Sequence, residues 1–386
     1  MTLTRRDLMK AVAAVVVEQW AGSRHLAFGE DRLNIRRKVV LITCGGMRRE
    51  DTFAADGLAN IPHLHTDLLS RAAFYPVVRN SGVTSHYNTI SSIFTGTWQR
   101  LDDWGKSRPA SPTLFEFLRK LSRLKSEDTW LISSNKALTS QIGASAVRDF
   151  GPSYGANVIF PKQLLINAVV RAAAQGRAVK GTDRTAVQPE LISMLNSDNY
   201  DGLGWSISGD ASSLDTPTLG IMQQAIADLI RTSDPVTGDE FTFLVSTEVM
   251  RRFAPSFLTI TFSDMEVAHF GSYSLHLAGI RTVDRLVFEL SKLIQELPAY
   301  KDKTTLFVLP EFGRDLDGST TNGFFNHRQN SDSTRLTWML CLGDAIRKPQ
   351  TIEDPIEQID LFPTIARLFE LNTFDLPGKP IPGMWL

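Results

Sequence analysis

The sequence Val39-Val40-Leu41-Ile42-Thr43-Cys44-Gly45-Gly46 carries no charged residue and closes on two glycines. An apolar run without alternation is typical of a strand that is buried on both faces, as in a parallel sheet. The two glycines allow the backbone to approach a ligand closely. We therefore expect residues 38–43 to form a strand of a parallel sheet, with the chemistry just beyond its carboxyl end.

Further apolar runs predict strands at residues 73–78, 129–133, 156–160, 257–262, 304–309 and 336–342. Helical patterns lie between them at residues 113–124, 164–174, 219–232, 283–297 and 356–371. This alternation predicts an α/β fold, with a doubly wound, mostly parallel sheet sandwiched by helices. Residues 175–238 are rich in Asp, Ser, Thr and Gly and lack strand signals, so we expect an inserted cap within a domain that spans residues 36–386.

The composition limits the class of partner. The chain has 386 residues, with 41 Lys and Arg against 42 Asp and Glu, and shows no basic stripe. This balance argues against nucleic acid and favours a small molecule or a discrete surface group as the substrate. Only Cys44 and Cys341 are present, each in an apolar run, which excludes a disulfide framework.

The amino terminus has the pattern of a targeting segment. Residues 4–10 read Thr-Arg-Arg-Asp-Leu-Met-Lys, and an apolar run follows from Ala11 to Val17. This order resembles a twin-arginine export signal, which implies the twin-arginine machinery as a partner, residues 1–28 as the signal and a periplasmic or secreted protein. An amphipathic helix of a cytoplasmic protein is the alternative. No segment reaches the ~20 apolar residues of a membrane span, so no integral membrane span is expected.

Five segments place polar side chains after predicted strands or before a predicted helix. They contribute Arg48; the trio Thr84, Ser85 and His86; the pair Asp264 and His269; the pair Glu311 and Arg314; and the loop residues Asn326, His327 and Arg328. A carboxylate and an imidazole at a strand end can converge on a divalent cation. Guanidinium groups can neutralise a substrate oxyanion through paired hydrogen bonds.

Taken in order, these segments resemble the alkaline phosphatase superfamily of sulfatases, phosphodiesterases and phosphopentomutases. The resemblance also includes three further stretches: Ile61-Pro62-His63-Leu64, Thr95-Gly96, and Ile359-Asp360-Leu361-Phe362-Pro363-Thr364-Ile365-Ala366 followed by Gly378-Lys379-Pro380-Ile381-Pro382. The turn Glu311-Phe312-Gly313-Arg314 is similar to that of a divergent secreted branch. The resemblance implies an alkaline-phosphatase-like fold and a divalent metal ion, with zinc or manganese as the candidates.

The resemblance also implies roles for single residues. Asp264, His269 and His327 fall where the family has the ligands of one metal, and Glu311 stands at a ligand position of the second. The family's nucleophile position, ten residues before Gly96, holds His86, and a shift of one or two residues brings in Ser85 or Thr84. Arg314 joins them as a catalytic candidate, while Arg48, Arg328 and Asn326 are candidates for substrate binding.

Two departures from the family pattern affect the second metal. Gly45 stands where the first strand normally ends in a metal-binding Asp, and Phe312 replaces a ligand imidazole. We therefore expect a metal-dependent hydrolase of a small-molecule or surface phosphate or sulfate ester, with a reduced, single-metal site. The alternative is a catalytically degraded member that acts as a periplasmic binding or assembly protein. In the simplest structural interpretation, Asp264 caps a loop and the histidines are ordinary loop residues.

Overall fold

The structure is a computed structural model that describes residues 9–14, 16–17, 37–162, 237–320, 322–373 and 376–384. Its described strands form one mixed sheet in the order β4-β3-β5-β1-β6-β7-β2-β8, with β9 paired to β2. The strands are β1 Lys38–Cys44, β2 Ala73–Arg79, β3 Thr129–Ser133, β4 Asn157–Ile159, β5 Phe257–Phe262, β6 Thr304–Pro310, β7 Leu336–Gly343, β8 Gln350–Thr351 and β9 Ile356–Glu357.

The centre of the sheet is parallel. Strand β1 pairs in parallel with β5 on one side and β6 on the other, and β3 continues this parallel half. Strand β7 runs antiparallel to both β6 and β2. The predicted doubly wound, mostly parallel sheet is confirmed, and the carboxyl ends of β5, β1 and β6 lie side by side at one edge.

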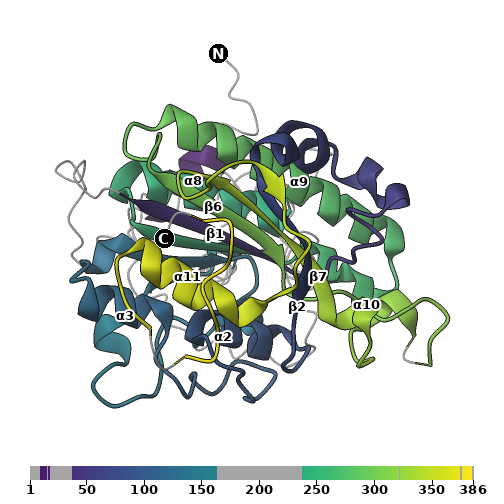
Figure 1. The fold of residues 1–386 in the computed structure, drawn as a ribbon, viewed down its shortest axis with the longest axis horizontal. Coiled ribbons are helices and arrows are strands. Elements are labelled where there is room, and N and C mark those ends of the chain that lie inside the picture. The colour runs from purple at the N-terminus through teal and green to yellow at the C-terminus, as the bar shows by residue number, and fades with distance from the viewer. Residues whose placement is uncertain are drawn as a thin grey trace, which may run out of the picture.

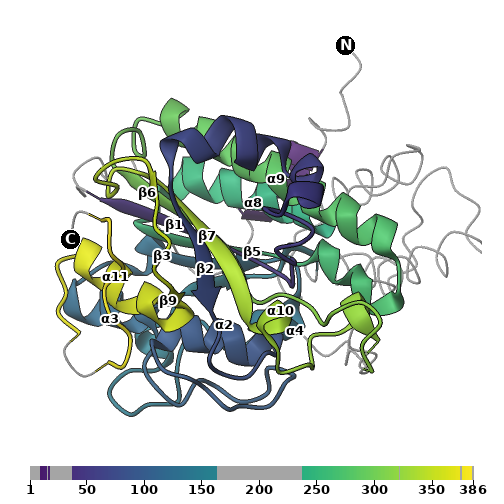
Figure 2. The same cartoon turned by 45° about the vertical axis from the view of Figure 1, so that its right-hand side comes forward.

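Helices cover both faces of the sheet (Figures 1 and 2). Helices α8 (Gly238–Phe253) and α9 (Tyr273–Glu296) cover one face, and α2 (His86–Thr95), α3 (Leu114–Leu121) and α11 (Leu361–Leu368) cover the other. The short helix α4 (Lys136–Thr139) lies beside α2, and α10 (Asp332–Arg335) precedes β7.

Successive side chains of β1 belong to different cores. Val40 and Ile42 lie in the apolar cluster that contains the buried residues of α8 and α9. Val39 and Leu41 lie in the cluster of α2, α3 and α11. A strand that buries both of its faces has no polar face to present, which explains why its sequence lacks alternation.

Helix α9 starts earlier than the sequence predicts, and one glycine explains the difference. Helix α9 begins ten residues before the predicted start at residue 283, and it contains Gly279. An added Cβ at Gly279 would lie 2.8 Å from the backbone nitrogen of Met265. Gly279 weakens the helical pattern in the sequence, which explains why the start of α9 is predicted too late. The lack of a side chain at Gly279 allows α9 to pack closely against the segment after β5.

The other predicted strands and helices agree in part with the structure. All seven predicted strands are present, whereas residues 356–371 begin with β9 and a short 3-10 turn before α11. The predicted helices at 164–174 and 219–232 lie outside the described residues. The same holds for the expected cap at 175–238, apart from Thr237 and Gly238, at the start of α8. Both cysteines are free and buried.

Part of the amino-terminal segment is helical. Residues 9–14, 16 and 17 are in helical conformation, and Met9, Val12, Ala13, Val16 and Val17 are buried in the cluster of α8 and α9. In the described part of the chain, every helix is too short or too polar to span a bilayer.

Candidate metal centre

Four potential metal ligands converge at the carboxyl ends of the central strands. Glu266 and His269 lie in the 3-10 segment η6 (Asp264–Phe270) after β5, and His86 is the first residue of α2. His327 follows the short turn η7 (Gly323–Phe325). One donor atom from each residue lies within 4.8 Å of the other three. We call these four residues the His3Glu cluster.

The carboxylate of Glu266 lies between two of the imidazoles. Its Oε2 atom is 3.2 Å from His86 Nε2 and 3.0 Å from His269 Nε2. The ring of His327 lies 5.0 Å from that of His269 and 4.9 Å from that of His86, in edge-on arrangements. Three nitrogens and one oxygen thus point into a common space.

Outer residues fix the orientation of two of these imidazoles. His86 Nδ1 lies 2.6 Å from Glu311 Oε2, and His327 Nδ1 lies 2.7 Å from the backbone oxygen of Thr84. These contacts leave Nε2 of each ring directed towards the cluster. A carboxylate or a carbonyl at the second ring nitrogen is the usual outer partner of a metal-bound histidine.

Glu266 is held by groups from the neighbouring strands. Its carboxylate accepts hydrogen bonds from Arg314 Nη2 at 2.6 Å and from the backbone nitrogen of Gly46 at 2.5 Å. An added Cβ at Gly45 would lie 2.3 Å from Glu266 Oε1 and 2.9 Å from the sulfur of Met265. The glycine at the end of β1 therefore provides the space that the Glu266 carboxylate fills.

The charge states differ among the imidazoles. Burial lowers the pKa of His269 to about 4, and burial together with the charge of His86 lowers the pKa of His327 well below its usual range. Burial also opposes protonation of His86, but the carboxylates of Glu266 and Glu311 outweigh it and raise the pKa of His86 to about 10. His269 and His327 therefore offer neutral nitrogens, the form that binds metal.

The two carboxylates also differ. Burial favours the neutral form of Glu266, but the positive charges of Arg314 and His86 hold its pKa well below the usual range. Burial raises the pKa of Glu311 to about 7, although His86 opposes this shift. Glu266 is thus the ionised carboxylate of the site, and Glu311 acts on the cluster only through the ring of His86.

Asp264 is not a member of the His3Glu cluster. Its carboxylate accepts a hydrogen bond from the backbone nitrogen of Asp239 at 2.8 Å, at the start of α8. In a 3-10 helix, side chains three residues apart lie on the same side. Glu266 and His269 therefore share a face of η6, whereas Asp264 points elsewhere. The resemblance assigned Asp264, five residues before His269, as a ligand; in the structure Glu266, three residues before His269, takes its place in the cluster.

Several expected residues bind other parts of the protein. Arg314 donates from Nε to the oxygen of Gly46 at 2.8 Å, so its buried guanidinium supports Glu266 and the β1 turn. Ser85 Oγ donates to Asp103 at 2.7 Å. Thr84 Oγ1 donates to the backbone oxygen of His327 at 3.0 Å. Thr84 and Arg314 therefore position ligands of the cluster.

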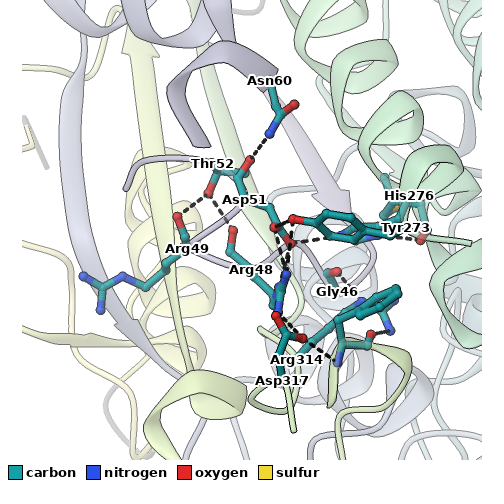
Figure 3. Close-up of polar contacts among 12 residues, drawn as sticks. Gly46, Arg48, Arg49, Asp51, Thr52, Asn60, Tyr273, His276, Arg314 and Asp317 are labelled. Carbon is teal, nitrogen blue, oxygen red and sulfur yellow. Dashed lines mark hydrogen bonds and ion pairs between the residues drawn. The ribbon is translucent and has the colours of Figure 1, made fainter. Parts of the chain in front are cut away.

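Among the candidates for substrate binding, Arg48 is engaged within the protein, whereas substrate binding by Arg328 and Asn326 stays a prediction. Figure 3 shows the Arg48 guanidinium facing Asp51 and Asp317, with Nε 2.7 Å from Asp51 Oδ2 and Nη1 2.9 Å from Asp317 Oδ1. Arg328 is exposed, and its backbone nitrogen donates to Asp315. The backbone oxygen of Asn326 accepts from the backbone nitrogen of Asp315. Arg48 thus forms a buried ion pair.

Phe312 stands where the resemblance has a ligand imidazole of the family's second metal site. The Phe312 ring packs 4.3 Å from His327 and 4.9 Å from His86, measured between ring centroids. An aromatic ring offers no donor for zinc or manganese, and it shields one side of the two imidazoles. Glu311, the other expected ligand of that site, contacts His86 Nδ1 instead.

The donor set of the cluster fits one divalent ion. Zinc binds imidazole nitrogen and carboxylate oxygen at about 2.0–2.2 Å in a near-tetrahedral arrangement, so its ligand atoms lie about 3.4 Å apart. The donor atoms of the cluster lie within 4.8 Å of one another. Side-chain shifts of about 1 Å would complete this geometry, while the outer contacts of His86, Glu266 and His327 already match those of metal ligands.

Comparisons with known proteins agree with this architecture. No protein-family model matches the chain, and no curated protein matches it in sequence. Among solved structures, wild-type alkaline phosphatase PafA is similar with a TM-score of 0.55 and 13% identity, over 91% of this chain and 99% of PafA.

Two further structures show the same likeness. The lipoteichoic acid synthase LtaP from Listeria monocytogenes has a TM-score of 0.53 and 10% identity, over 95% of this chain and 82% of LtaP. A putative sulfatase from Bacteroides thetaiotaomicron has a TM-score of 0.53 and 11% identity, over 89% and 73%. The chain therefore has the alkaline-phosphatase-like fold that the resemblance implied.

Proposed function

We propose that the chain is a metal-dependent hydrolase of a phosphate or sulfate ester, with a single-metal site at the His3Glu cluster. The observation that carries this proposal is the convergence of His86, Glu266, His269 and His327 at the carboxyl ends of the central strands. Ligands of open α/β sheets bind at this edge. The names of two similar structures, an alkaline phosphatase and a putative sulfatase, support the same class of reaction.

The residues divide into ligands and supports. His86, Glu266, His269 and His327 would hold the ion, and zinc or manganese suits their nitrogen and oxygen donors. A divalent cation at such a site polarises a phosphoryl or sulfuryl oxygen and lowers the pKa of bound water. Arg314 keeps the Glu266 carboxylate in place and ionised. Glu311 accepts the Nδ1 proton of His86, and the second proton of this imidazolium, at Nε2, would be released when the ion binds.

The first experiment measures metal content. The purified chain should contain close to one equivalent of zinc or manganese by elemental analysis, and Glu266→Gln and His327→Ala should lose most of it. Asp264→Asn is the matched control: its carboxylate lies at the start of α8, so this variant should keep the metal. Loss of metal in Asp264→Asn with retention in Glu266→Gln would reverse our assignment of the ligands.

The second experiment tests the reaction. Aryl phosphate monoesters, aryl phosphate diesters and aryl sulfates should be screened with the metal-loaded chain. Turnover of at least one class should disappear in Glu266→Gln and persist in Asp264→Asn. Because hydrolysis by bound water needs no protein nucleophile, Ser85→Ala should retain turnover. Its Oγ atom bonds to Asp103 rather than to the cluster.

A second candidate function is cation-dependent binding without catalysis. The packing of Phe312 against His86 and His327 favours it, because this ring occupies one flank of the cluster. The pairing of Arg48 with Asp51 favours it as well, since that guanidinium is engaged within the protein. Bound metal without turnover of any ester class would support this candidate over the hydrolase.

We also propose export through the twin-arginine pathway, with a periplasmic or secreted location. The sequence of residues 4–10 supports this proposal. In an exporting bacterial host, a reporter fused to residues 1–28 should leave the cytoplasm, and the double substitution Arg5→Lys and Arg6→Lys should keep it inside. Export of the double variant would contradict the twin-arginine route, and retention of the unsubstituted fusion in the cytoplasm would favour the cytoplasmic alternative.

A further inference from the structure

Segment η6, which carries His269, and the turn η7, which precedes His327, lie against each other. Segment η6 carries His269 and is followed by Gly271, while η7 directly precedes the loop of His327. An added Cβ at Gly271 would lie 2.8 Å from the ring of Phe325. The end of η6 is therefore in direct contact with η7, and the positive φ of 77° at Gly271 shapes this contact.

Aromatic rings continue from this contact. The Phe324 ring lies 4.5 Å from the Phe325 ring and 4.9 Å from the Tyr273 ring, between centroids. Tyr273 is the first residue of α9, three positions after Phe270. These rings connect the end of η6 to the loop of His327. The backbone oxygen of Leu316 lies beside the start of η7, 3.2 Å from the position of an added Cβ at Gly323. We call Phe270, Tyr273, Phe324, Phe325 and Leu316 the apolar strip.

The apolar strip is open to solvent at several points. Phe270 is 61% exposed, Leu316 is 52% exposed and Tyr273 is 40% exposed. Isolated exposed apolar residues are common, but a contiguous set is typical of a binding surface. Of the other large apolar residues exposed in the described part of the chain, Leu275 lies on α9, two positions after Tyr273, whereas Val83 and Trp104 lie in loops and Leu121 ends α3.

The strip rests on a rigid polar base. The Tyr273 hydroxyl donates to Asp51 Oδ1 at 2.6 Å, and the guanidinium carbon of Arg48 lies 5.6 Å from the Tyr273 ring and 5.8 Å from the Phe324 ring. Figure 3 shows Tyr273 and Arg48 converging on Asp51. Rings held in this way are already arranged for binding, so the protein loses little conformational entropy when a ligand binds.

We propose that the apolar strip binds the alcohol portion of the ester, so that the substrates are phosphate or sulfate esters of long-chain or aryl alcohols. The inference rests on the proposed function, because the strip borders the His3Glu cluster through His269 and His327. With the phosphoryl or sulfuryl group at the cluster, the alcohol portion of a bound ester extends over the strip. Each methylene buried there adds about 0.8 kcal/mol to binding.

The test compares two esters whose alcohols differ only in chain length. The metal-loaded full chain should have a kcat/KM for octyl phosphate at least about tenfold above that for ethyl phosphate, or the same ratio with the two sulfates. Leu316→Ser and Phe270→Ser should lower this ratio about fivefold and leave the ethyl ester within about twofold of wild type. Leu121→Ser, an exposed leucine at the end of α3, is the matched control and should change neither value.

A binding measurement separates this inference from the proposed function. By calorimetry, octyl phosphate should bind the metal-loaded chain at least about tenfold more tightly than ethyl phosphate, and the two strip variants should remove the difference. Such a preference without turnover would support the strip and overturn the hydrolase. Equal binding of both esters would overturn the strip. Binding to phosphatidylcholine vesicles that depends on Leu316, with equal ester binding, would also overturn it and assign the strip to a lipid surface.

Discussion

Gly45 and Glu266 form a complementary pair at the residue scale. The Glu266 carboxylate fills the space that a side chain at position 45 would enter. A carboxylate carried by β1 would therefore compete with the one carried by η6. Because the two chain positions lead to the same space, a carboxylate at either position would reach the proposed metal site.

We predict that an aspartate at position 45 rescues the loss of Glu266. Glu266→Ala should lower bound metal at least about tenfold, in line with removal of a ligand, and Gly45→Asp in that background should restore most of it. The measurement is metal affinity by competition with a chelator. Gly45→Ala combined with Glu266→Ala is the control, since it adds the Cβ without a carboxylate. Equal affinity of the two double variants would contradict the shared position.

Asp51 is a buried carboxylate whose pKa is lowered by its hydrogen-bond donors. Burial favours its neutral form, but hydrogen bonds from His276, Arg48 and Tyr273 outweigh this effect and hold the pKa of Asp51 well below its usual range. The folded state thus binds the Asp51 proton less readily than the unfolded chain, whose aspartates titrate near pH 3.9. The stabilisation is present above that pH and is lost as the pH falls towards the folded pKa.

We predict a pH-dependent gap between wild type and Asp51→Asn. At pH 7 the variant should lose about 3 kcal/mol of unfolding free energy, because Arg48 keeps a buried charge without its main partner. The gap should stay constant down to about pH 5 and shrink below about pH 4. Urea unfolding at pH 7, 5 and 3.5 checks this. Asp332→Asn, at a carboxylate that is 77% exposed, should show no comparable change. A gap of unchanged size at pH 3.5 would argue against the assigned pKa.

At the scale of elements, the loop after β6 determines where His327 lies. Buried Asp315 accepts hydrogen bonds from the backbone nitrogens of Arg328 and Gln329 and from Thr334 Oγ1. Exposed Asp317 pairs with Arg48 at 2.9 Å. Asp317 also accepts a hydrogen bond from the backbone nitrogen of Phe324 at 3.3 Å, before His327, whereas the buried carboxylate of Asp315 binds the two residues directly after His327.

We predict different effects for these two carboxylates. Asp315→Ala should lose about 3 kcal/mol of stability, since it leaves buried donors unsatisfied, and it should weaken metal binding at least about fivefold. Asp317→Ala should change stability by less than about 1 kcal/mol, because an ion pair with one exposed partner contributes little. Thermal unfolding and chelator competition measure both. Equal loss of metal affinity in the two variants would show that Asp315 does not hold the His327 loop.

For the whole molecule, the proposed metal site joins segments that are distant in the sequence. The ligands come from the start of α2, from η6 and from the loop after η7. An ion bound to all three segments stabilises the folded chain by mass action, by about 2.7 kcal/mol at a free concentration one hundred times the Kd.

We predict that chelation lowers the melting temperature of the wild type and leaves Glu266→Gln almost unchanged. For a chain of this size, a loss of about 2.7 kcal/mol corresponds to a fall of several degrees. Differential scanning calorimetry with and without EDTA gives the comparison. Glu248→Gln, which removes a carboxylate on α8, should respond to EDTA like the wild type. An equal response of Glu266→Gln would place the ion elsewhere.

The sequence by itself determined the strands, the alternation of strands and helices, and the edge of the sheet at which polar residues gather. Continuous apolar runs such as Val39–Ile42 predict buried strands because burial on both faces leaves no place for alternation. The resemblance singled out His269 and His327 as metal ligands and His86 as the residue at the nucleophile position, and the structure brings all three together in the cluster.

Only the tertiary structure decided which carboxylate joins them. The choice between Asp264 and Glu266 depends on the 3-10 geometry of η6, where residues three apart lie on one side, and on the space left by Gly45 on a strand more than two hundred residues away. It likewise decided that Arg48 and Arg314 bond to carboxylates of the protein itself. Local patterns set which segments form strands and helices, but side-chain direction depends on backbone geometry and on neighbours that are distant in the sequence.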